Sequence, residues 1–352
     1  MTTDKDPFRD NLKIFRNKIE MLLRYHLDAV VEAIISGNDP VLPIPVRGGT
    51  LDFSKNPLKF GNPKIKNVFW FISYLEMYLE TMIEVYLNVL RGQVRTKRDL
   101  FYGNCALYKK QSTLDSLVAN LARTFSVPRD ALNVVGASKG LYYGDIIIND
   151  IIVPLNNVNL IPRREEIVSV DLLSTKFVLI IEKDAVMNVI IDQYKYLKNL
   201  LGSFLLICGK GFPCMRTKQF MNLIEVKYPH IPKYIIVDND PYGIDIVLNY
   251  IVDSENEADG CRSIEYIGVN HFDIDKYANP RMTETLTATD LRRLESVKTK
   301  AKALNRFREL DEIKFMQNNL KKSEIESLYY PDCESFCTKF LLDKLQGILP
   351  TS

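Results

Sequence analysis

The sequence predicts an α/β protein in which an N-terminal winged helix-turn-helix precedes a doubly wound parallel sheet. Two observations support this fold class: a long amphipathic helical pattern with two short helical patterns and a β-rich stretch after it, and an alternation of apolar runs with helix-length segments beyond Asp171. The chain has 352 residues, 46% of them hydrophobic, which is enough for two buried cores. We therefore expect two folded domains.

The N-terminal half begins with a predicted long helix over residues 67–93. Its apolar residues recur at helical spacing, with glutamates between them; they are Phe69, Ile72, Tyr74, Leu75, Tyr78, Met82, Val85, Tyr86 and Val89. The runs TKRDLFYGNCALYKK and QSTLDSLVANLARTF then predict two short helices, and NVVGASKGLYYGDIII predicts a β-hairpin. Two helices and a hairpin in this order are typical of a winged helix.

The C-terminal half contains four apolar runs, KFVLIIE, SFLLICG, KYIIVDND and SIEYIGV, separated by helical segments beginning near Ala185, Cys214 and Pro241. Such runs are typical of parallel strands covered on both faces by crossover helices. Ligands of these sheets bind outside the carboxyl ends of the strands. The charged helical region from Thr289 to Ser352 carries no motif and is interpreted as packing or partner surface.

Composition restricts the function. The net charge is only +2, but nine lysines and arginines against three aspartates lie between Arg91 and Lys139, so any DNA surface must be this local patch, although a protein-binding face explains it equally well. Six cysteines without a Cys-x-x-Cys pair, and no apolar leader, predict a reducing compartment. No apolar stretch approaches the roughly 20 residues of a membrane span, so we expect a soluble protein.

Carboxylates dominate the predicted strand ends. Asp238 and Asp240 flank Asn239, and the period of two along a strand directs both toward one side. Glu182 ends another strand of the same predicted sheet, and an acidic triad of this kind suits Mg²⁺. The Asp-x-Asp pair alone would more readily indicate a helix cap and a turn; Glu182 reverses that preference. EF-hand spacing, a P-loop and a dinucleotide fingerprint are absent, so calcium, ATP and NAD are not indicated.

Five runs together carry a family resemblance: TKRDLFYGN, GASKGLYYG, VLIIEKDAV, GKGFP and IIVDNDPYG. On these runs, from about Asn67 to Tyr277, the chain resembles the topoisomerase VI A family, and within it the meiotic double-strand-break proteins. The resemblance implies a helical extension at residues 1–65, a CAP-like winged-helix domain at 66–168 and a Toprim domain with C-terminal helices at 169–352. Phe101 stands where a tyrosine is often found, and Cys214 and Lys218 stand where an aspartate and an arginine are common.

The resemblance also implies roles for single residues. Tyr102 becomes the nucleophile and Arg98 a contact to phosphate or transition state, while Glu182, Asp238 and Asp240 hold Mg²⁺. The lysines expected to contact DNA are Lys97, Lys109, Lys139 and Lys210.

The expected function is cleavage of nuclear, chromosomal DNA in meiosis, which initiates homologous recombination. Attack by the tyrosine would leave the protein on the DNA 5′ end. We expect a homodimer that acts with accessory meiotic break proteins and a topoisomerase VI B-like subunit. Two alternatives stay open: a catalytic topoisomerase VI A protein that reseals DNA with an ATPase partner, and a winged-helix protein that binds DNA without cleaving it and whose acidic site is structural.

Overall fold

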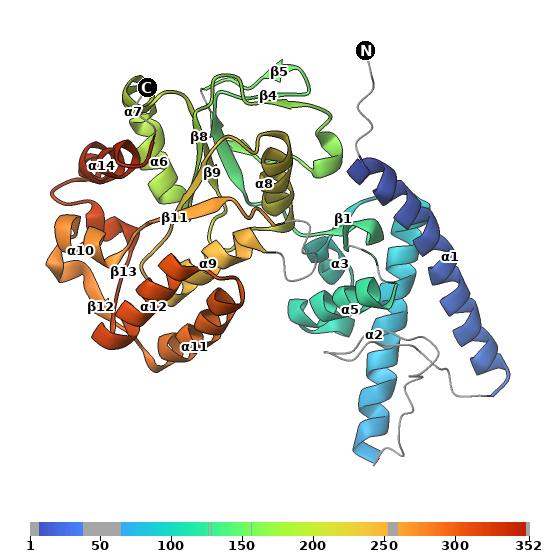
Figure 1. Ribbon diagram of the computed structural model, residues 1–352. Coiled ribbons are helices and arrows are strands. Elements are labelled where there is room, and N and C mark those ends of the chain that lie inside the picture. The colour runs from blue at the N-terminus through green and yellow to red at the C-terminus, as the bar shows by residue number, and fades with distance from the viewer. Residues whose placement is uncertain are drawn as a thin grey trace. The chain divides into compact units, whose positions relative to one another are not determined.

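The computed structural model describes residues 7–37, 65–125, 127, 129–155, 157–252 and 260–349 (Figure 1). The chain forms two compact units, residues 1–137 and residues 138–352. The expected extension at residues 1–65 is described only over 7–37 and at residue 65. Over 7–37 it forms the helix α1 (Pro7–Ile35).

The first unit is mainly helical. The predicted long helix is confirmed as α2 (Ile65–Leu90), followed by α3 (Lys97–Gly103), α4 (Cys105–Tyr108), α5 (Gln111–Thr124) and the short η1 (Arg129–Leu132). Its core joins apolar residues of three helices, Ile19 and Leu23 of α1, Tyr78, Met82 and Val85 of α2, and Leu114, Leu117, Val118 and Leu121 of α5. Their spacing of three, four or seven residues along each helix explains why one face of each is buried.

The stretch that was expected to form the wing does not form it. Leu141–Gly144 is the strand β3, which pairs antiparallel with β9 (Phe204–Cys208) and with β6 (Asn159–Leu160) inside the sheet of the second unit. Tyr142 and Tyr143 are buried there, which a surface hairpin would not achieve. In the first unit, β1 (Arg95–Thr96) pairs instead with β2 (Val134–Val135), in parallel. The units therefore divide between Ala137 and Ser138, not at the expected boundary between residues 168 and 169.

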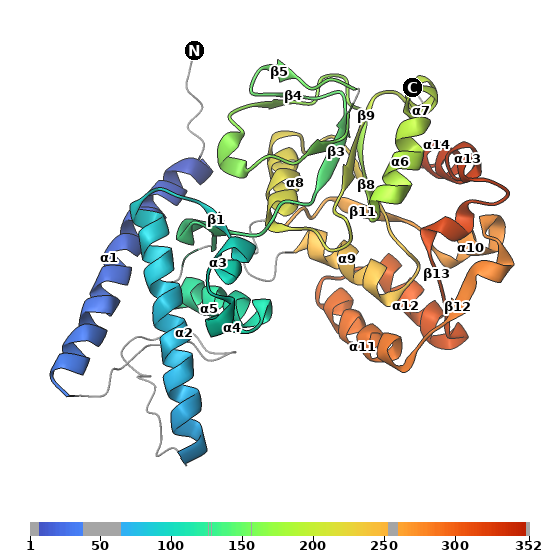
Figure 2. The same cartoon turned by 180° about the vertical axis from the view of Figure 1, so that it is seen from behind.

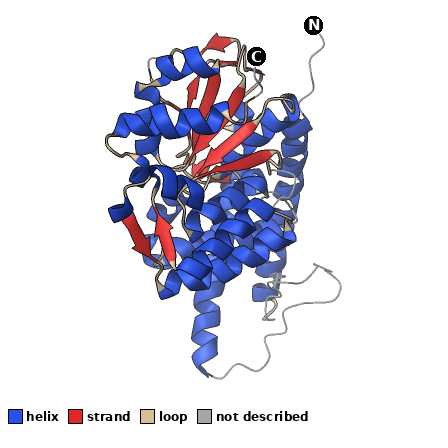
Figure 3. Ribbon diagram, turned by 60° about the vertical axis from the view of Figure 1, so that its left-hand side comes forward, coloured by secondary structure: helices blue, strands red, loops and turns tan. Residues whose placement is uncertain are grey.

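The second unit is built on a six-stranded sheet of order β11-β10-β8-β9-β3-β6. The strands β8 (Phe177–Ile181), β9, β10 (Lys233–Ile236) and β11 (Ile264–Gly268) are the four predicted apolar runs and pair in parallel. Two smaller sheets accompany it, one of β4 (Ile147–Ile148), β5 (Ile151–Ile152) and β7 (Val170–Asp171), the other of β12 (Thr283–Thr285) and β13 (Lys321–Ser323). In Figure 3 the strands are red and the surrounding helices blue.

Helices cover both faces of the large sheet, as Figures 1 and 2 show from opposite sides. One core packs alternate strand residues against α8 (Met215–Lys227), α9 (Pro241–Ile251), α11 (Ala288–Ala303) and α12 (Phe307–Asn319). The other packs the intervening residues against α6 (Asp184–Asp192), α7 (Tyr194–Leu201) and α14 (Leu342–Gln346). The strands are therefore buried on both sides, which explains their unbroken apolar sequences.

The region after Thr289, which lacked a motif, contributes directly to these cores. Besides α11, α12 and α14, it forms η5 (Ile325–Leu328), α13 (Cys333–Ser335) and η6 (Phe336–Leu341), and it follows α10 (His271–Tyr277) and η4 (Pro280–Met282). Packing, one of its two expected roles, is thereby confirmed. Among the helices of the described segments, none has the length and apolarity needed to cross a membrane.

The stacked pair Phe177 and Phe204 tests the core. Their rings lie 5.0 Å apart at 5°, and both side chains are fully buried. Phe177→Ala should lower the free energy of unfolding by about 3–5 kcal/mol, because it leaves a cavity between sheet and helices. Phe307→Ala makes the same change at a side chain that is 73% exposed and should cost far less. Equal losses in urea denaturation of the two variants would contradict this view of the core.

Candidate functional site

Three strand ends meet at one edge of the large sheet. Ile181, the last residue of β8, pairs with Ile236 of β10 on one side and with Cys208 of β9 on the other. The residues that follow these strands, Glu182, Asp238 and Gly209, therefore lie at neighbouring strand ends, as the sequence predicted for the two carboxylates.

Hydrogen bonds connect Glu182 to both neighbouring strand ends. Its carboxylate Oε2 accepts from the backbone N–H of Asp238 at 2.9 Å. Its carbonyl oxygen accepts from the backbone N–H of Gly211, also at 2.9 Å. The glutamate is thus held from β10 and from the loop after β9, which orients its carboxylate toward the aspartates.

Burial and like charge shape the electrostatics of the three predicted metal ligands. Burial, together with the nearby charges of Asp238 and Asp240, raises the pKa of Glu182 to about 8. Burial raises the pKa of Asp238 to about 6, although Lys183 opposes the rise, and burial also raises the pKa of Asp240. Each charged carboxylate therefore makes ionisation of its neighbours less favourable, and a cation nearby would relieve that repulsion.

Lys183 supplies one such positive charge. Its Nζ lies 3.0 Å from Asp238 Oδ2, 2.7 Å from Glu326 Oε2 and 3.4 Å from Glu324 Oε2. The other oxygen of Asp238, Oδ1, accepts from the backbone N–H of Ile325 at 2.9 Å. Both oxygens of this aspartate are consequently occupied by protein donors.

Asp240 has a local structural role as well. Its Oδ1 accepts from the backbone N–H of Gly243 at 2.6 Å and caps α9. The helix-cap interpretation of the Asp-x-Asp pair thus holds for its second member. Within the described parts of the chain, no three histidine, cysteine, aspartate or glutamate side chains are arranged closely enough to hold a metal ion as they stand. The structure makes the three carboxylates neighbours without converging them on one point.

Tyr102 and Arg98 lie on one exposed face of α3. A capping box begins this helix, in which Thr96 and Asp99 exchange hydrogen bonds of 3.1 Å, and Leu100 anchors the opposite face in the core. Tyr102 is 69% exposed, and Arg98, four residues earlier, is exposed too. The Tyr102 phenol and the Arg98 guanidinium, one helical turn apart, are therefore both accessible on the surface of the first unit.

The lysines predicted to contact DNA fall into two pairs. Lys97 lies 3.7 Å from Asp115, and Lys109 is exposed at the end of α4, both in the first unit. In the second unit, Lys139 Nζ donates to the Lys210 carbonyl at 2.9 Å, and Lys210 Nζ lies 3.1 Å from Asp184. Tertiary folding brings the second pair together from loops 71 residues apart.

Cys214, where the family commonly has an aspartate, is the N-cap residue of α8, but its side chain makes no capping hydrogen bond to the helix backbone. Its Sγ lies 3.3 Å from Thr217 Oγ1. Burial opposes ionisation of this thiol, but hydrogen bonds from Thr217 and from the backbone of Lys139 and Gly140 outweigh it and lower its pKa. Cys214 therefore keeps a polar contact with Thr217 in the first turn of α8 but does not replace the helix cap that an aspartate could form. Lys218, where an arginine is common, is largely buried.

Sequence reasoning missed the contribution of the C-terminal region to this edge. Besides Ile325, Ser323 pairs with Asn239 through two backbone hydrogen bonds of 2.9 and 3.0 Å, and Glu312 of α12 contacts the Asn239 side chain. A signal did exist, because Glu309 and Glu312 stand among the apolar residues of FRELDEIKFM at helical spacing. A carboxylate on a buried helical face needs a polar partner.

Comparison with known proteins identifies two matching domain families. The Toprim domain family of Spo11 and of the topoisomerase 6 A-type subunits matches residues 177–345, and the family described as "Type IIB DNA topoisomerase" matches residues 74–134. The first segment includes the three carboxylates, and the second includes Tyr102 and Arg98.

Curated relatives agree with these families. The meiotic recombination protein SPO11 of Mus musculus is 25% identical over 290 residues, covering 77% of this chain and 70% of that protein. The meiosis-specific protein SPO11 of Saccharomyces cerevisiae is 31% identical over 198 residues, covering 51% and 49%. The A-type subunit of DNA topoisomerase 6 from Arabidopsis thaliana is 25% identical over 251 residues, covering 68% and 58%.

Gly243 tests how tightly α9 packs against the acidic strand end. A Cβ on Gly243 would lie 2.2 Å from the Asp238 carbonyl oxygen, so Gly243→Ala must displace backbone and should lower the free energy of unfolding by about 1–3 kcal/mol. Gly136→Ala is the matched control, since a Cβ there meets no atom within 4 Å. If chemical denaturation shows Gly243→Ala to be as stable as Gly136→Ala, the close approach of α9 is wrong.

Proposed function

This chain belongs to the topoisomerase VI A/Spo11 family, and from that premise we propose that it forms meiotic DNA double-strand breaks by a topoisomerase-like transesterification. The observation that carries the proposal is the exposure of Tyr102, one helical turn from Arg98, in the segment that matches type IIB topoisomerases.

The reaction is an exchange of phosphate esters. Tyr102 Oη gives up its proton to water and forms a bond to the phosphorus of a DNA phosphodiester, while the bond from phosphorus to the 3′ oxygen breaks. The electron pair of the broken bond stays on the leaving oxygen, which takes up a proton, and the DNA 5′ end remains attached as a phosphotyrosine. A free phenol with a pKa of about 10 is a weak nucleophile at neutral pH. Arg98 would bind the phosphate and stabilise the negative charge on the phenolate and the transition state.

Glu182, Asp238 and Asp240 would hold Mg²⁺. The fit rests on the donor set, three carboxylates at neighbouring strand ends. Burial raises the pKa of each of them, and an oxygen-binding cation would favour their ionised forms. When bound, the ion would supply positive charge to the phosphate or to the leaving oxygen. Oδ2 of Asp238 could bind the ion only after its ion pair with Lys183 breaks. Glu324 and Glu326 already contact the same ammonium group.

The proposed partners follow from the family and from the chemistry. A double-strand break requires two tyrosines on opposite strands, so the active form is a homodimer on double-stranded DNA. Accessory meiotic break proteins and a topoisomerase VI B-like subunit would complete the assembly on nuclear chromosomes. Lys97, Lys109, Lys139 and Lys210 would contact phosphates.

A second function has specific support in the similarity to the topoisomerase 6 protein of Arabidopsis thaliana. A protein with that function would pair with an ATPase partner and reseal the strands. Adding ATP and a B-type partner to supercoiled DNA distinguishes the two functions, because only the topoisomerase would relax it. A covalent adduct would exclude the remaining alternative, a winged-helix protein that binds DNA without cleaving it.

Tyr102→Phe should remove the covalent protein-DNA adduct while DNA binding and folding persist, because it deletes only the attacking oxygen. Tyr25→Phe is the matched control, since Tyr25 is 71% exposed in the same unit. Adducts are measured by denaturing electrophoresis of labelled DNA after incubation with Mg²⁺ and partner proteins. Wild-type adduct levels in Tyr102→Phe would overturn the assignment of the nucleophile.

A mixed dimer tests whether each active site draws Tyr102 from one copy and the metal ligands from the other. Combining Tyr102→Phe with Glu182→Ala subunits would then leave one intact site and one doubly defective site, so the heterodimer should nick a single strand. Differently tagged subunits, purified through both tags, confirm that heterodimers bind the DNA. Loss of all nicking by such heterodimers would show that each site lies within one chain.

A further inference from the structure

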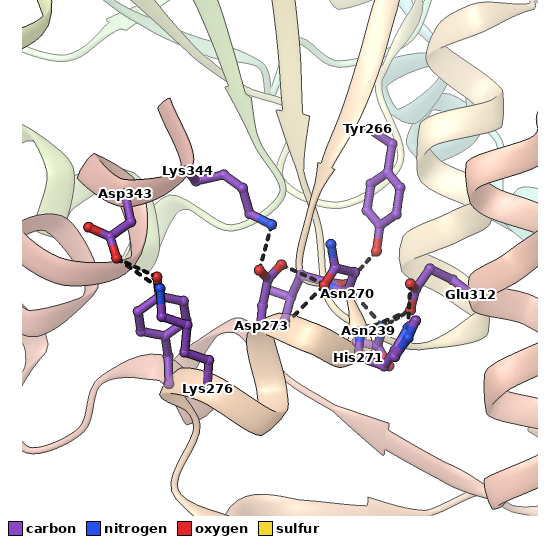
Figure 4. A network of polar contacts seen from close by, with 11 residues as sticks. Asn239, Tyr266, Asn270, His271, Asp273, Lys276, Glu312, Asp343 and Lys344 are labelled. Carbon is purple, nitrogen blue, oxygen red and sulfur yellow. Dashed lines mark hydrogen bonds and ion pairs between the residues drawn. The ribbon is translucent and has the colours of Figure 1, made fainter. Parts of the chain in front are cut away.

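Asn239, between the two aspartates of the strand end, is held from inside the protein. Its side chain is 1% exposed, and Nδ2 donates to the Val269 carbonyl at 3.0 Å and to Glu312 Oε2 at 3.1 Å (Figure 4). Its backbone pairs with Ser323 on the other side. Because the side chains of Asp238 and Asp240 flank this residue, its backbone position determines where both carboxylates begin.

Glu312 is a buried carboxylate whose contacts converge on the same place. It is 5% exposed on α12, where its neighbours Ile313 and Met316 are fully buried. Its Oε2 accepts from the backbone N–H of His271 at 3.1 Å as well as from Asn239, and its Oε1 lies 2.7 Å from His271 Nδ1. Three polar contacts offset the cost of burying this carboxylate.

The His271 ring is itself held in place by packing. It stacks on Phe315 with centroids 4.2 Å apart and planes at 15°, and it contacts Phe272 at 3.9 Å. The stacking restricts rotation of the ring and keeps Nδ1 directed at Glu312. A chain of contacts therefore runs from α10 through α12 to the residue between the aspartates.

A packing role alone does not explain this arrangement. The buried face of α12 carries one other carboxylate, Glu309, which is paired with Arg306, and its remaining buried residues are apolar. An apolar residue in place of Glu312 would avoid the cost of desolvating a charge. What the carboxylate adds is a fixed acceptor for the Asn239 amide, which limits movement of the strand end. Groups behind metal ligands commonly act in this way, by fixing the orientation of the ligands.

We propose that Glu312, oriented by His271, is a positioning residue for the divalent-metal site and acts through Asn239 on Asp238 and Asp240. This inference rests on the proposed function, because it takes these aspartates as metal ligands. Glu312 touches neither substrate nor metal. Its effect is to keep the strand end in a geometry that the ion can use.

Glu312→Gln makes the smallest change that tests the idea. It replaces one carboxylate oxygen with an amide N–H₂ group, so the acceptor that Oε2 provides for Asn239 is either lost to that group or left without its negative charge, which weakens the hydrogen bond. The strand end loses a fixed contact, and metal affinity should fall about 10- to 100-fold, the range found when groups behind metal ligands are changed. Glu309→Gln is the matched control, because Glu309 is a buried carboxylate of the same helix that binds Arg306 and not the strand end.

Binding of Mn²⁺, used as a substitute for Mg²⁺, is measured by electron paramagnetic resonance on the full chain without DNA. Thermal unfolding of each metal-free variant is recorded in parallel. We expect both glutamine variants to lose thermal stability and only Glu312→Gln to lose Mn²⁺ affinity. His271→Phe keeps the stacked ring and removes Nδ1, so it should weaken binding several-fold and provides a milder variant if Glu312→Gln does not fold.

Unchanged Mn²⁺ affinity in Glu312→Gln and His271→Phe would overturn the proposal, as would an equal loss in Glu309→Gln. Metal binding separates this inference from the proposed function. A wild-type protein that binds Mn²⁺ through Glu182, as judged with Glu182→Gln, but never cleaves DNA would refute the function and leave the positioning result intact. A wild-type protein that binds no Mn²⁺ would refute both the metal site and its positioning.

Discussion

The hydrogen bond from the Asp238 backbone to the Glu182 carboxylate is the contact on which the arrangement of the acidic site depends. It exists because β8 and β10 pair in parallel with Ile181 opposite Ile236, so that the next residues of both strands leave the sheet at the same edge. A shift of the register by one residue would direct Glu182 toward the opposite face and separate it from the aspartates. The two apolar cores that enclose β8 hold this register, since each face of the strand has its own packing partners.

Burial of several carboxylates at one edge has an energetic cost, and the fold offsets it with nearby donors. The backbone N–H groups of Ile325 and Gly243 each donate to one aspartate, and Lys183 places an ammonium on Asp238. These donors favour the ionised aspartates, but burial and the two neighbouring aspartates still raise the pKa of Glu182 to about 8, so this carboxyl is mostly protonated at neutral pH. A divalent cation bound to the three carboxylates would favour the ionised form of Glu182.

The C-terminal region contacts this edge through several hydrogen bonds. Backbone pairing at Ser323, the N–H of Ile325 and the carboxylate of Glu312 come from a segment that follows the acidic strand end by more than 70 residues. The same region fills part of both cores. Its packing and its contacts with Asn239 are therefore one structural feature, and the matched family segment extends through it to residue 345.

Local sequence by itself determined the four parallel strands and the helix α2, and it singled out the candidate residues of the site. Unbroken apolar runs identified the four parallel strands, helical spacing identified α2, and Glu182, Asp238 and Asp240 were recognisable because strand ends and residue types are local properties. The resemblance of TKRDLFYGN to its family singled out Tyr102 among 18 tyrosines. Only the tertiary structure decided that β3 joins the large sheet, that Lys183 forms an ion pair with Asp238, and that Glu312 accepts a hydrogen bond from Asn239. These contacts join residues distant in the chain, and nothing in the spacing around either partner specifies which distant surface will bury it.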